Sequence, residues 1–271
     1  MVAAEPGEGI AEREWRRYTP RQRWQRLAGF AAAVAATAWA LSTIDVFWPW
    51  LFDAPEQMGD LFGRMVPPDV SAWRAIAEAL LETVNIATIA TLISVFLSLP
   101  IALLAAQNTT PNRATLWLGR FILVSSRSVN TIIWALLFVA IFGPGALAGI
   151  LAIIFRSIGF LGKLVGEAIE EIDRRPIEAL EATGASRSKI LLFGVVPQVM
   201  PTFFAVSILR WDINLRESTV LGLVGAGGIG LILQGSIDTF AWQTVSTILL
   251  AIIALVLFGE AVAAWLRERI I

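Results

Sequence analysis

The 271-residue chain has no cysteine and no histidine, and only 16% of its residues are charged. Without cysteine it has no disulfide framework, no thiolate nucleophile and no iron–sulfur or cysteine-type zinc site. Without histidine it lacks the commonest general base, the commonest metal ligand and the usual Ser-His-Asp triad. It also contains no GxxxxGK[ST] sequence, so no P-loop for ATP. Most familiar enzyme chemistry is therefore excluded.

Apolar residues are abundant: they make up 56% of the chain, and the mean hydropathy is +0.70. A soluble domain carries about a quarter charged residues, so this chain has too little polar surface for one. The net charge of −1 conceals a strong segregation of charge along the sequence. The composition is that of an integral membrane protein.

Long stretches without charge give the positions of the membrane spans, each of which needs roughly 20 apolar helical residues. The first charge-free stretch is Leu27 to Ile44, and we assign the first transmembrane helix to residues 27–48. Gly143-Pro144-Gly145 divides the longest stretch, because a helix does not continue through it. The sequence thus predicts about six helices, with further spans at 83–107, 116–142, 146–161, 190–209 and 239–259.

A charge-free segment at 218–236 is ambiguous, because its six glycines disfavour a full helix. With six spans, Arg and Lys concentrate on one side, and both termini are cytoplasmic. A seventh span would carry Arg267 and Arg269 outside, against the positive-inside rule. We therefore predict that this segment is a re-entrant or broken helix buried in protein.

The N-terminal tail, residues 1–26, contains six arginines and is predicted to be cytoplasmic. One interpretation is an amphipathic segment on anionic headgroups. The other is a simple determinant of topology, and the sequence does not choose between them.

Residues 163–189 form the longest predicted cytoplasmic segment. Pro176 suits the first position of a short helix, with Asp173 as a cap and Glu178 in the first turn. Gly184 suits the left-handed residue that ends a helix, and Ser186 can cap the next one. A structured loop on a membrane protein indicates that a partner docks on it.

The sequence Glu178-Ala-Leu-x-x-x-Gly184, followed by Pro197, resembles the EAA loop of ABC-importer permeases. Two departures are mild: Leu180 takes the third position, and Gly194 and Val196 replace the usual Ile and Leu before the proline. The resemblance implies a coupling helix that sits in a groove of a separate ATPase subunit. The residues it assigns to this contact are Arg174, Arg175, Glu178, Ala179, Glu181, Gly184, Ala185 and Ser186.

Several strings in order extend the resemblance over about residues 80 to 265. They are Ser157-Ile-Gly-Phe-Leu-Gly-Lys163, Glu167-Ala-Ile-Glu170, Glu178 to Ser186, and Val220-Leu-Gly-Leu-Val-Gly-Ala-Gly-Gly-Ile-Gly230. Together they are similar to the permease subunit of phosphonate importers. This implies an all-α membrane protein of type I ABC-importer architecture, with a transport core at 80–266 that includes residues 163–189, here called the coupling loop.

The same resemblance implies the partners and the cargo. It predicts a homodimer in the inner membrane, two ATPase subunits that hold Mg-ATP, and an extracytoplasmic substrate-binding protein that docks near 51–75 and 210–240. The cargo would be a phosphonate or a related oxyanion, phosphate or phosphite. No cofactor, metal or nucleic acid is expected on this chain.

Charged residues inside the predicted membrane region are the remaining candidates, because such groups rarely face lipid. In one interpretation, guanidinium groups guide the oxyanion by charge-assisted hydrogen bonds. In the other, arginines and acids pair with each other and fix the structure, which we favour for Asp212 and Glu217 and leave open for Arg216. The candidate pathway and gate residues are Arg127, Arg210, Asn214, Arg216, Glu217, Gly225, Gly227 and Gly228.

Gly225-Ala-Gly-Gly-Ile-Gly230 also fits the dinucleotide pattern GxGxxG, but it has neither the preceding strand nor the acid about 20 residues on. Close helix packing at a gate explains these glycines better. Two other functions stay open from the sequence. An ion-coupled secondary transporter would need an intramembrane relay and inverted repeats, and a lipid-phosphate enzyme would need a catalytic cluster.

Overall fold

The computed structural model describes residues 18–44 and 47–270, which fall into two units separated between Gly59 and Asp60. The first unit contains α1 (Pro20–Thr43). A capping box begins this helix: the Thr19 hydroxyl accepts from the Gln22 N–H at 3.4 Å, and Gln22 Oε1 accepts from the Thr19 N–H at 3.1 Å. The helix α2 (Pro49–Met65) runs across the boundary between the units.

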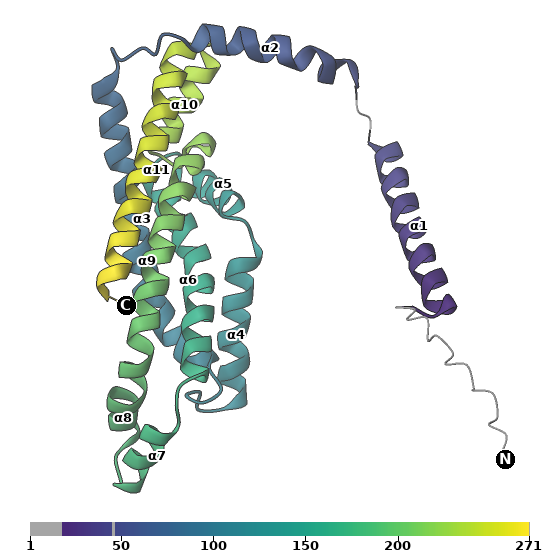
Figure 1. Cartoon of the computed structure of the whole chain (residues 1–271). Helices are drawn as coiled ribbons and strands as arrows, with labels where there is room; N and C mark the ends of the chain where they lie inside the picture. The colour runs from purple at the N-terminus through teal and green to yellow at the C-terminus, as the bar shows by residue number, and fades with distance from the viewer. Residues whose placement is uncertain (1–17, 45–46, 271) are drawn as a thin grey trace, which may run out of the picture. The chain divides into compact units, whose positions relative to one another are not determined.

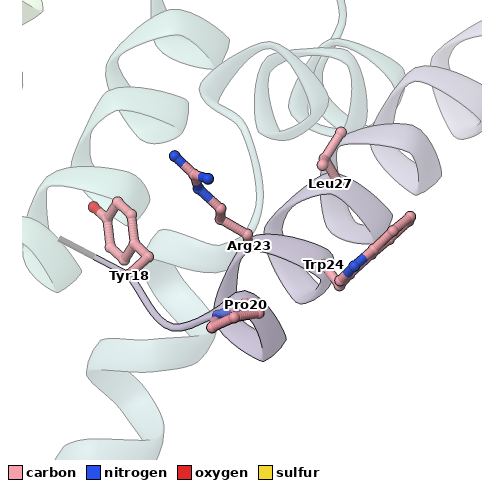
Figure 2. Close-up of a pocket in the computed structure, with 5 residues that line it drawn as sticks. All are labelled: Tyr18, Pro20, Arg23, Trp24 and Leu27. Carbon is pink, nitrogen blue, oxygen red and sulfur yellow. The ribbon is translucent and has the colours of Figure 1, made fainter. Parts of the chain in front are cut away.

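The second unit is a helical bundle (Figure 1). Its helices are α3 (Trp73–Ala105), α4 (Arg113–Ser128), α5 (Thr131–Phe142), α6 (Ala146–Glu170), α7 (Arg175–Ala182), α8 (Arg187–Ile190), the π-helix η1 (Leu191–Val195), α9 (Val196–Leu221), the 3₁₀ turn η2 (Gly222–Val224), α10 (Ile229–Asp238) and α11 (Trp242–Ile270). Within the described residues there is no β-strand, which confirms the all-α prediction.

The helix α6 lies at the centre of the bundle and packs against α3, α4, α5 and α9. Small residues allow this close approach. A Cβ on Gly159 would lie 2.6 Å from the Leu123 carbonyl oxygen of α4, and a Cβ on Gly149 would lie 2.5 Å from the Ala226 carbonyl oxygen. The glycines of α6 therefore fix its distance to α4 and to the glycine segment.

Four segments of the described chain are long and apolar enough to cross a membrane: 73–105, 146–170, 187–238 and 242–270. The pair α4 and α5 adds a fifth if it is counted as one span, and α1 is not among them. The chain is thus multi-pass, as predicted, but the number of six spans is not confirmed.

Three of the predicted spans differ in extent from the helices observed. The span predicted at 116–142 is two helices bent by 88°, because Asn130 interrupts it and caps α5: its Oδ1 accepts from the Ile132 N–H at 3.0 Å. The spans predicted at 146–161 and 190–209 are too short, since α6 continues to Glu170 and α9 to Leu221. The charges after Leu209 therefore belong to a continuous helix.

The glycine segment breaks the helix, as predicted. The helix α9 ends at Leu221, and positive φ angles follow at Gly225 (85°), Gly227 (84°) and Gly228 (71°) before α10 begins. The break is anchored on two other helices: the Ile229 N–H donates to Thr83 Oγ1 at 2.8 Å, and the Gly145 N–H donates to the Gly225 carbonyl at 2.8 Å. A chain that turns this way needs residues without a Cβ.

Candidate coupling loop and intramembrane charge cluster

The short helix predicted in the coupling loop is α7 (Arg175–Ala182). Its N-cap is Arg174, and Pro176 occupies the second position, one residue later than predicted. Asp173 still takes part in the start of the helix, since its Oδ1 accepts from the Arg175 N–H at 3.0 Å. The loop itself is shorter than predicted, because residues 163–170 belong to α6.

The end of α7 has the geometry that the sequence predicts. Gly184 has φ of 75°, and the Ala185 N–H donates to the Leu180 carbonyl at 3.2 Å while the Gly184 N–H donates to the Glu181 carbonyl at 2.9 Å. This pattern is a Schellman-type end. Ser186 occupies the N-cap of α8, but its side chain makes no capping hydrogen bond, so only its position agrees with the prediction.

One face of α7 packs on the π-helix η1. A Cβ on Gly194 would lie 3.2 Å from Leu180 Cδ1 and 3.3 Å from Ile177 Cγ1, so both side chains fill the space above this glycine. Leu180 and Gly194 are two of the positions where the sequence departs from the EAA pattern. The departures compensate each other, because the larger residue on α7 lies against the smaller one on η1.

Gln198 ties the start of α7 to α9, and the sequence analysis missed it. Its Oε1 accepts from the Asp173 N–H at 2.9 Å, and its Nε2 donates to the Asp173 carbonyl at 3.2 Å and to the Gly194 carbonyl at 2.7 Å. A π-helix leaves backbone carbonyls poorly satisfied, and no pattern in the sequence predicts one here.

A groove of about 700 Å³ opens beside α7 and α8. The loop after α3, residues 108–111, forms part of its wall, and Arg174, Glu178 and Glu181 line it from α7. Glu170 holds this wall in place: its Oε1 accepts from Arg120 Nη2 at 3.1 Å and from the Gln107 N–H at 2.8 Å. Three of the predicted ATPase contacts thus lie together around one groove.

The second candidate region is the α9 charge cluster, consisting of Arg156, Arg210 and Glu217. The Glu217 carboxylate lies 3.4 Å from Arg210 Nη2 and 3.8 Å from Arg156 Nε, and it accepts from Thr131 Oγ1 at 2.8 Å. Two guanidinium groups thus share one carboxylate, and the residues come from α5, α6 and α9.

Arg210 is the most buried charge of the cluster, with a side chain 3% exposed. Its Nε donates to Ser157 Oγ at 2.9 Å, and Ser157 Oγ donates in turn to Asn214 Oδ1 at 3.3 Å. Asn214 Nδ2 donates to Thr91 Oγ1 at 2.8 Å. This chain of hydrogen bonds joins α9 to α6 and α3 and compensates for burial of the guanidinium.

Arg156 holds the bend between α4 and α5. Its Nη1 donates to the Arg127 carbonyl at 3.2 Å and to the Val129 carbonyl at 3.0 Å. These carbonyls end α4 and have no partner within their helix. The Arg156 hydrogen bonds attach the α4 side of the 88° bend to α6. The Thr131–Glu217 hydrogen bond attaches the α5 side to α9.

Arg216 is separate from the cluster. It forms an ion pair with Asp212, one helical turn earlier, and its side chain is 47% exposed while that of Asp212 is 8% exposed. Asp212 Oδ1 is buried without a hydrogen-bond partner. The structure therefore brings together Arg210, Asn214 and Glu217 of the predicted pathway residues. Arg216 lies on the exposed side of α9, and Arg127 contributes its carbonyl while its side chain is exposed.

The helical bundle, the broken helix and the structured loop define a membrane transport protein of the ABC-importer permease class. A protein-family model described as "Binding-protein-dependent transport system inner membrane component" matches residues 98–271, and the chain belongs to this family.

Relatives and solved structures agree with this assignment. The chain is 39% identical, over 91% of its length and 90% of the relative's, to the phosphite transport system permease protein PtxC of Stutzerimonas stutzeri. It is 38% identical, over 90% of its length and 46% of the relative's, to the phosphate-import permease protein PhnE of Mycolicibacterium smegmatis. A structure of the MetNI methionine ABC transporter shares the fold, with a TM-score of 0.65 and 20% identity over 75% of this chain and 99% of that one.

Proposed function

We propose that this chain forms the translocation pathway of an ABC importer whose cargo is a phosphorus oxyanion: phosphite, phosphonate or phosphate. The observation that carries the proposal is the 39% identity over nine-tenths of the chain to a phosphite permease. A relative 40% identical over 45% of this chain is a putative cryptic phosphonate permease of Escherichia coli. These relatives share one cargo chemistry, a tetrahedral phosphorus oxyanion.

The charge in the membrane region supports an anionic cargo. Between the end of α4 and the end of α9, the charges predicted inside the membrane are four arginines, Arg127, Arg156, Arg210 and Arg216, and two acids, Asp212 and Glu217, while Glu82 and Glu260 lie in the candidate spans α3 and α11. Since Arg156 and Arg210 are bound by Glu217 and by backbone or hydroxyl groups, they serve structure. Arg216 and Arg127 keep exposed side chains, so we assign contact with the oxyanion to them.

Energy for transport would come from a separate ATPase, because this sequence has no P-loop. Two copies of the chain would form the pathway, and an ATPase subunit with bound Mg-ATP would dock on each coupling loop, at the groove beside α7. A substrate-binding protein would deliver the anion from outside. With both termini cytoplasmic, α7 and the ATPases lie on the same side of the membrane.

The coupling loop would transmit ATPase closure to the pathway. Movement of α7 reaches α9 through Gln198 and through the contact of Leu180 with Gly194. The helix α9 carries Arg210 about four turns and Glu217 about six turns beyond the π-helix, and it ends at the glycine break. We propose that α7, α8 and α9 move as one unit and that the break absorbs the change at the gate.

Uptake of labelled phosphite and phosphate by cells with and without the chain tests this proposal. Deletion should abolish uptake at low concentration, and unlabelled phosphite, phosphonate and phosphate, added in turn, identify the cargo by competition. Co-purification of an ATPase subunit with the tagged chain separates this function from secondary transport and from lipid-phosphate chemistry. Unchanged uptake of all three anions would overturn the proposal.

A paired substitution tests the role of Arg216. Removing Arg216 alone would strand the buried Asp212, so Arg216→Gln is combined with Asp212→Asn. We expect an inserted protein with strongly reduced uptake. The matched control combines Lys163→Gln with Glu167→Gln, since this pair has the same one-turn spacing on α6 and is exposed. Normal uptake in the first variant would exclude Arg216 from the pathway.

A further inference from the structure

The helix α2 (Pro49–Met65) has two chemically different faces. Residues three and four apart lie on the same side of a helix. This spacing puts Leu51, Ala54, Met58, Leu61, Phe62 and Met65 on one side. The opposite side carries Asp53, Glu56, Gln57, Asp60 and Arg64. No charged residue interrupts the apolar side, which is the pattern of an amphipathic helix.

The large apolar side chains of this helix are uncovered. Phe52 is 79% exposed, Trp50 71% and Leu51 63%, and Met58 and Phe62 are both more than half exposed. No residue of α2 is buried. Met65, at its end, belongs to the second unit and packs there against an apolar cluster that includes Ile76 and Val245. An apolar surface of this size on a single helix needs a partner or a lipid environment.

The position of α2 in the sequence identifies that environment. It lies between the first span, which the sequence predicts at 27–48, and the candidate span α3. If the first span crosses the membrane as predicted, α2 is attached to the membrane on both sides. With the N-terminus cytoplasmic, as proposed, this segment is on the extracytoplasmic side. Trp48 and Trp50 stand at its start, and tryptophan is enriched at the membrane–water interface. A helix held there can place its apolar side in the lipid without leaving the surface.

The charges on α2 indicate that its binding to lipid does not depend on anionic headgroups. Its polar side carries three acids and one arginine, and Arg64 is already paired with Asp60 at 2.6 Å. Electrostatic attraction to anionic lipids is therefore absent, and binding rests on apolar burial alone. A groove on a second protein would contact only part of α2 and would not require an apolar side along the whole helix. The apolar side is instead continuous from Leu51 to Met65.

We propose that α2 is an interfacial helix that lies in the headgroup region of the extracytoplasmic leaflet, with its apolar side in the lipid and its acidic side in water. The inference rests on the proposed topology but not on the cargo. It assigns the predicted binding-protein contact near 51–75 to the acidic side, which is the one that stays accessible from outside.

The chain has no cysteine, so single-cysteine variants report without background. Leu51→Cys, Met58→Cys and Phe62→Cys probe the apolar side. Their matched controls on the same helix are Asp53→Cys, Glu56→Cys and Asp60→Cys. Each full-length variant, expressed with its ATPase, is labelled with an environment-sensitive fluorophore and reconstituted in phosphatidylcholine vesicles that contain spin-labelled acyl chains.

We expect spin-labelled lipid to quench most of the fluorescence at the three apolar positions and to leave the acidic positions nearly unchanged. In cells, a membrane-impermeant maleimide added outside should modify the acidic positions only. Addition of 1 M salt should not change the quenching, because no charge attraction is involved. Equal quenching on both sides would overturn the proposal.

Two further outcomes would assign the apolar side to another occupant and so also overturn the proposal. Disulfide crosslinking of Met58→Cys between copies, without lipid quenching, would identify a second copy of the chain. Protection that appears only with the substrate-binding protein would identify that partner. Uptake measured with the unsubstituted chain keeps the two proposals separate, since lipid quenching in the variants without any oxyanion uptake by the unsubstituted chain would retain the interfacial helix and reject the cargo.

Discussion

The Gln198 side chain binds the backbone of Asp173 on both sides, accepting from its N–H at 2.9 Å and donating to its carbonyl at 3.2 Å. Asp173, two residues before the start of α7, is thereby attached to the first turn of α9. The same amide also donates to the Gly194 carbonyl of the π-helix at 2.7 Å. One side chain thus connects the proposed ATPase contact with the helix that carries the α9 charge cluster.

Gln198→Leu should uncouple ATP hydrolysis from uptake. The substitution removes three hydrogen bonds, each worth about 1 kcal/mol, while the volume changes little. We expect the variant to insert and to retain its ATPase, but to import less per ATP hydrolysed, measured in proteoliposomes. Gln198→Glu keeps the acceptor and loses the donors, so its coupling should be intermediate. Gln243→Leu is the control, because Gln243 is exposed at the start of α11, outside both predicted docking regions.

Gly184→Ala should weaken the end of α7 through the backbone alone. A Cβ at this position would meet no atom within 4 Å, but φ is +75°, and a left-handed residue with a side chain costs about 1–2 kcal/mol. Gly184→Asn should be milder, because asparagine tolerates this conformation. The measured quantity is again uptake relative to ATP hydrolysis.

Larger changes at the same loop, Glu178→Lys and Gly184→Arg, should abolish coupling while the chain stays inserted. The first reverses the charge in the first turn of α7, where a helix favours an acid. Normal uptake in either variant would show that this loop is not the ATPase contact.

Glu217→Ala should destabilise the bundle. It leaves Arg210 buried with its charge uncompensated, and removal of one partner of a buried pair costs on the order of 3 kcal/mol. It also frees Thr131 and with it one side of the α4–α5 bend. We expect a lower thermal unfolding midpoint in detergent. Combining Glu217→Ala with Arg210→Leu should recover part of the loss, and a double variant no more stable than Glu217→Ala would contradict the pairing.

Gly222→Ala should disturb the glycine break. A Cβ there would lie 2.5 Å from Gly230 Cα and 2.6 Å from the Gly227 carbonyl oxygen. Overpacking of this kind costs about 1–3 kcal/mol, so stability and uptake should both fall. Gly235→Ala is the control: a Cβ there would meet nothing within 4 Å, and alanine is favoured over glycine inside a helix. If both variants behave alike, the break is not closely packed.

Local chemistry explains what the sequence could predict in the coupling loop. Pro176 and Gly184 restrict the backbone whatever surrounds them, so a helix that starts near one and ends at the other follows from residue type. Which residue caps the start of the helix was not predictable from local sequence. Asp173 is held by Gln198, which is 25 positions away along the chain. That contact exists only after α9 has packed beside α7.

For the charged residues, the sequence predicted the environment but not the pairing. Their sequence positions indicated that they face protein or water, because lipid does not accommodate them. Which arginine pairs with which acid was not predictable: Arg210 and Arg156 reach Glu217 from two helices, while Arg216 remains with Asp212. Pairing depends on the directions in which helical side chains point after packing.

Composition and residue order alone determined that this chain is an all-helical membrane protein, with a structured loop between Pro176 and Gly184 and a helix broken by glycines, since apolarity, fixed φ and missing Cβ atoms act locally. Only the tertiary structure decided the 88° bend after α4, the extension of α9 through its charges and the link from Asp173 to Gln198. These features arise from hydrogen bonds between helices, and such bonds join residues that the sequence keeps far apart.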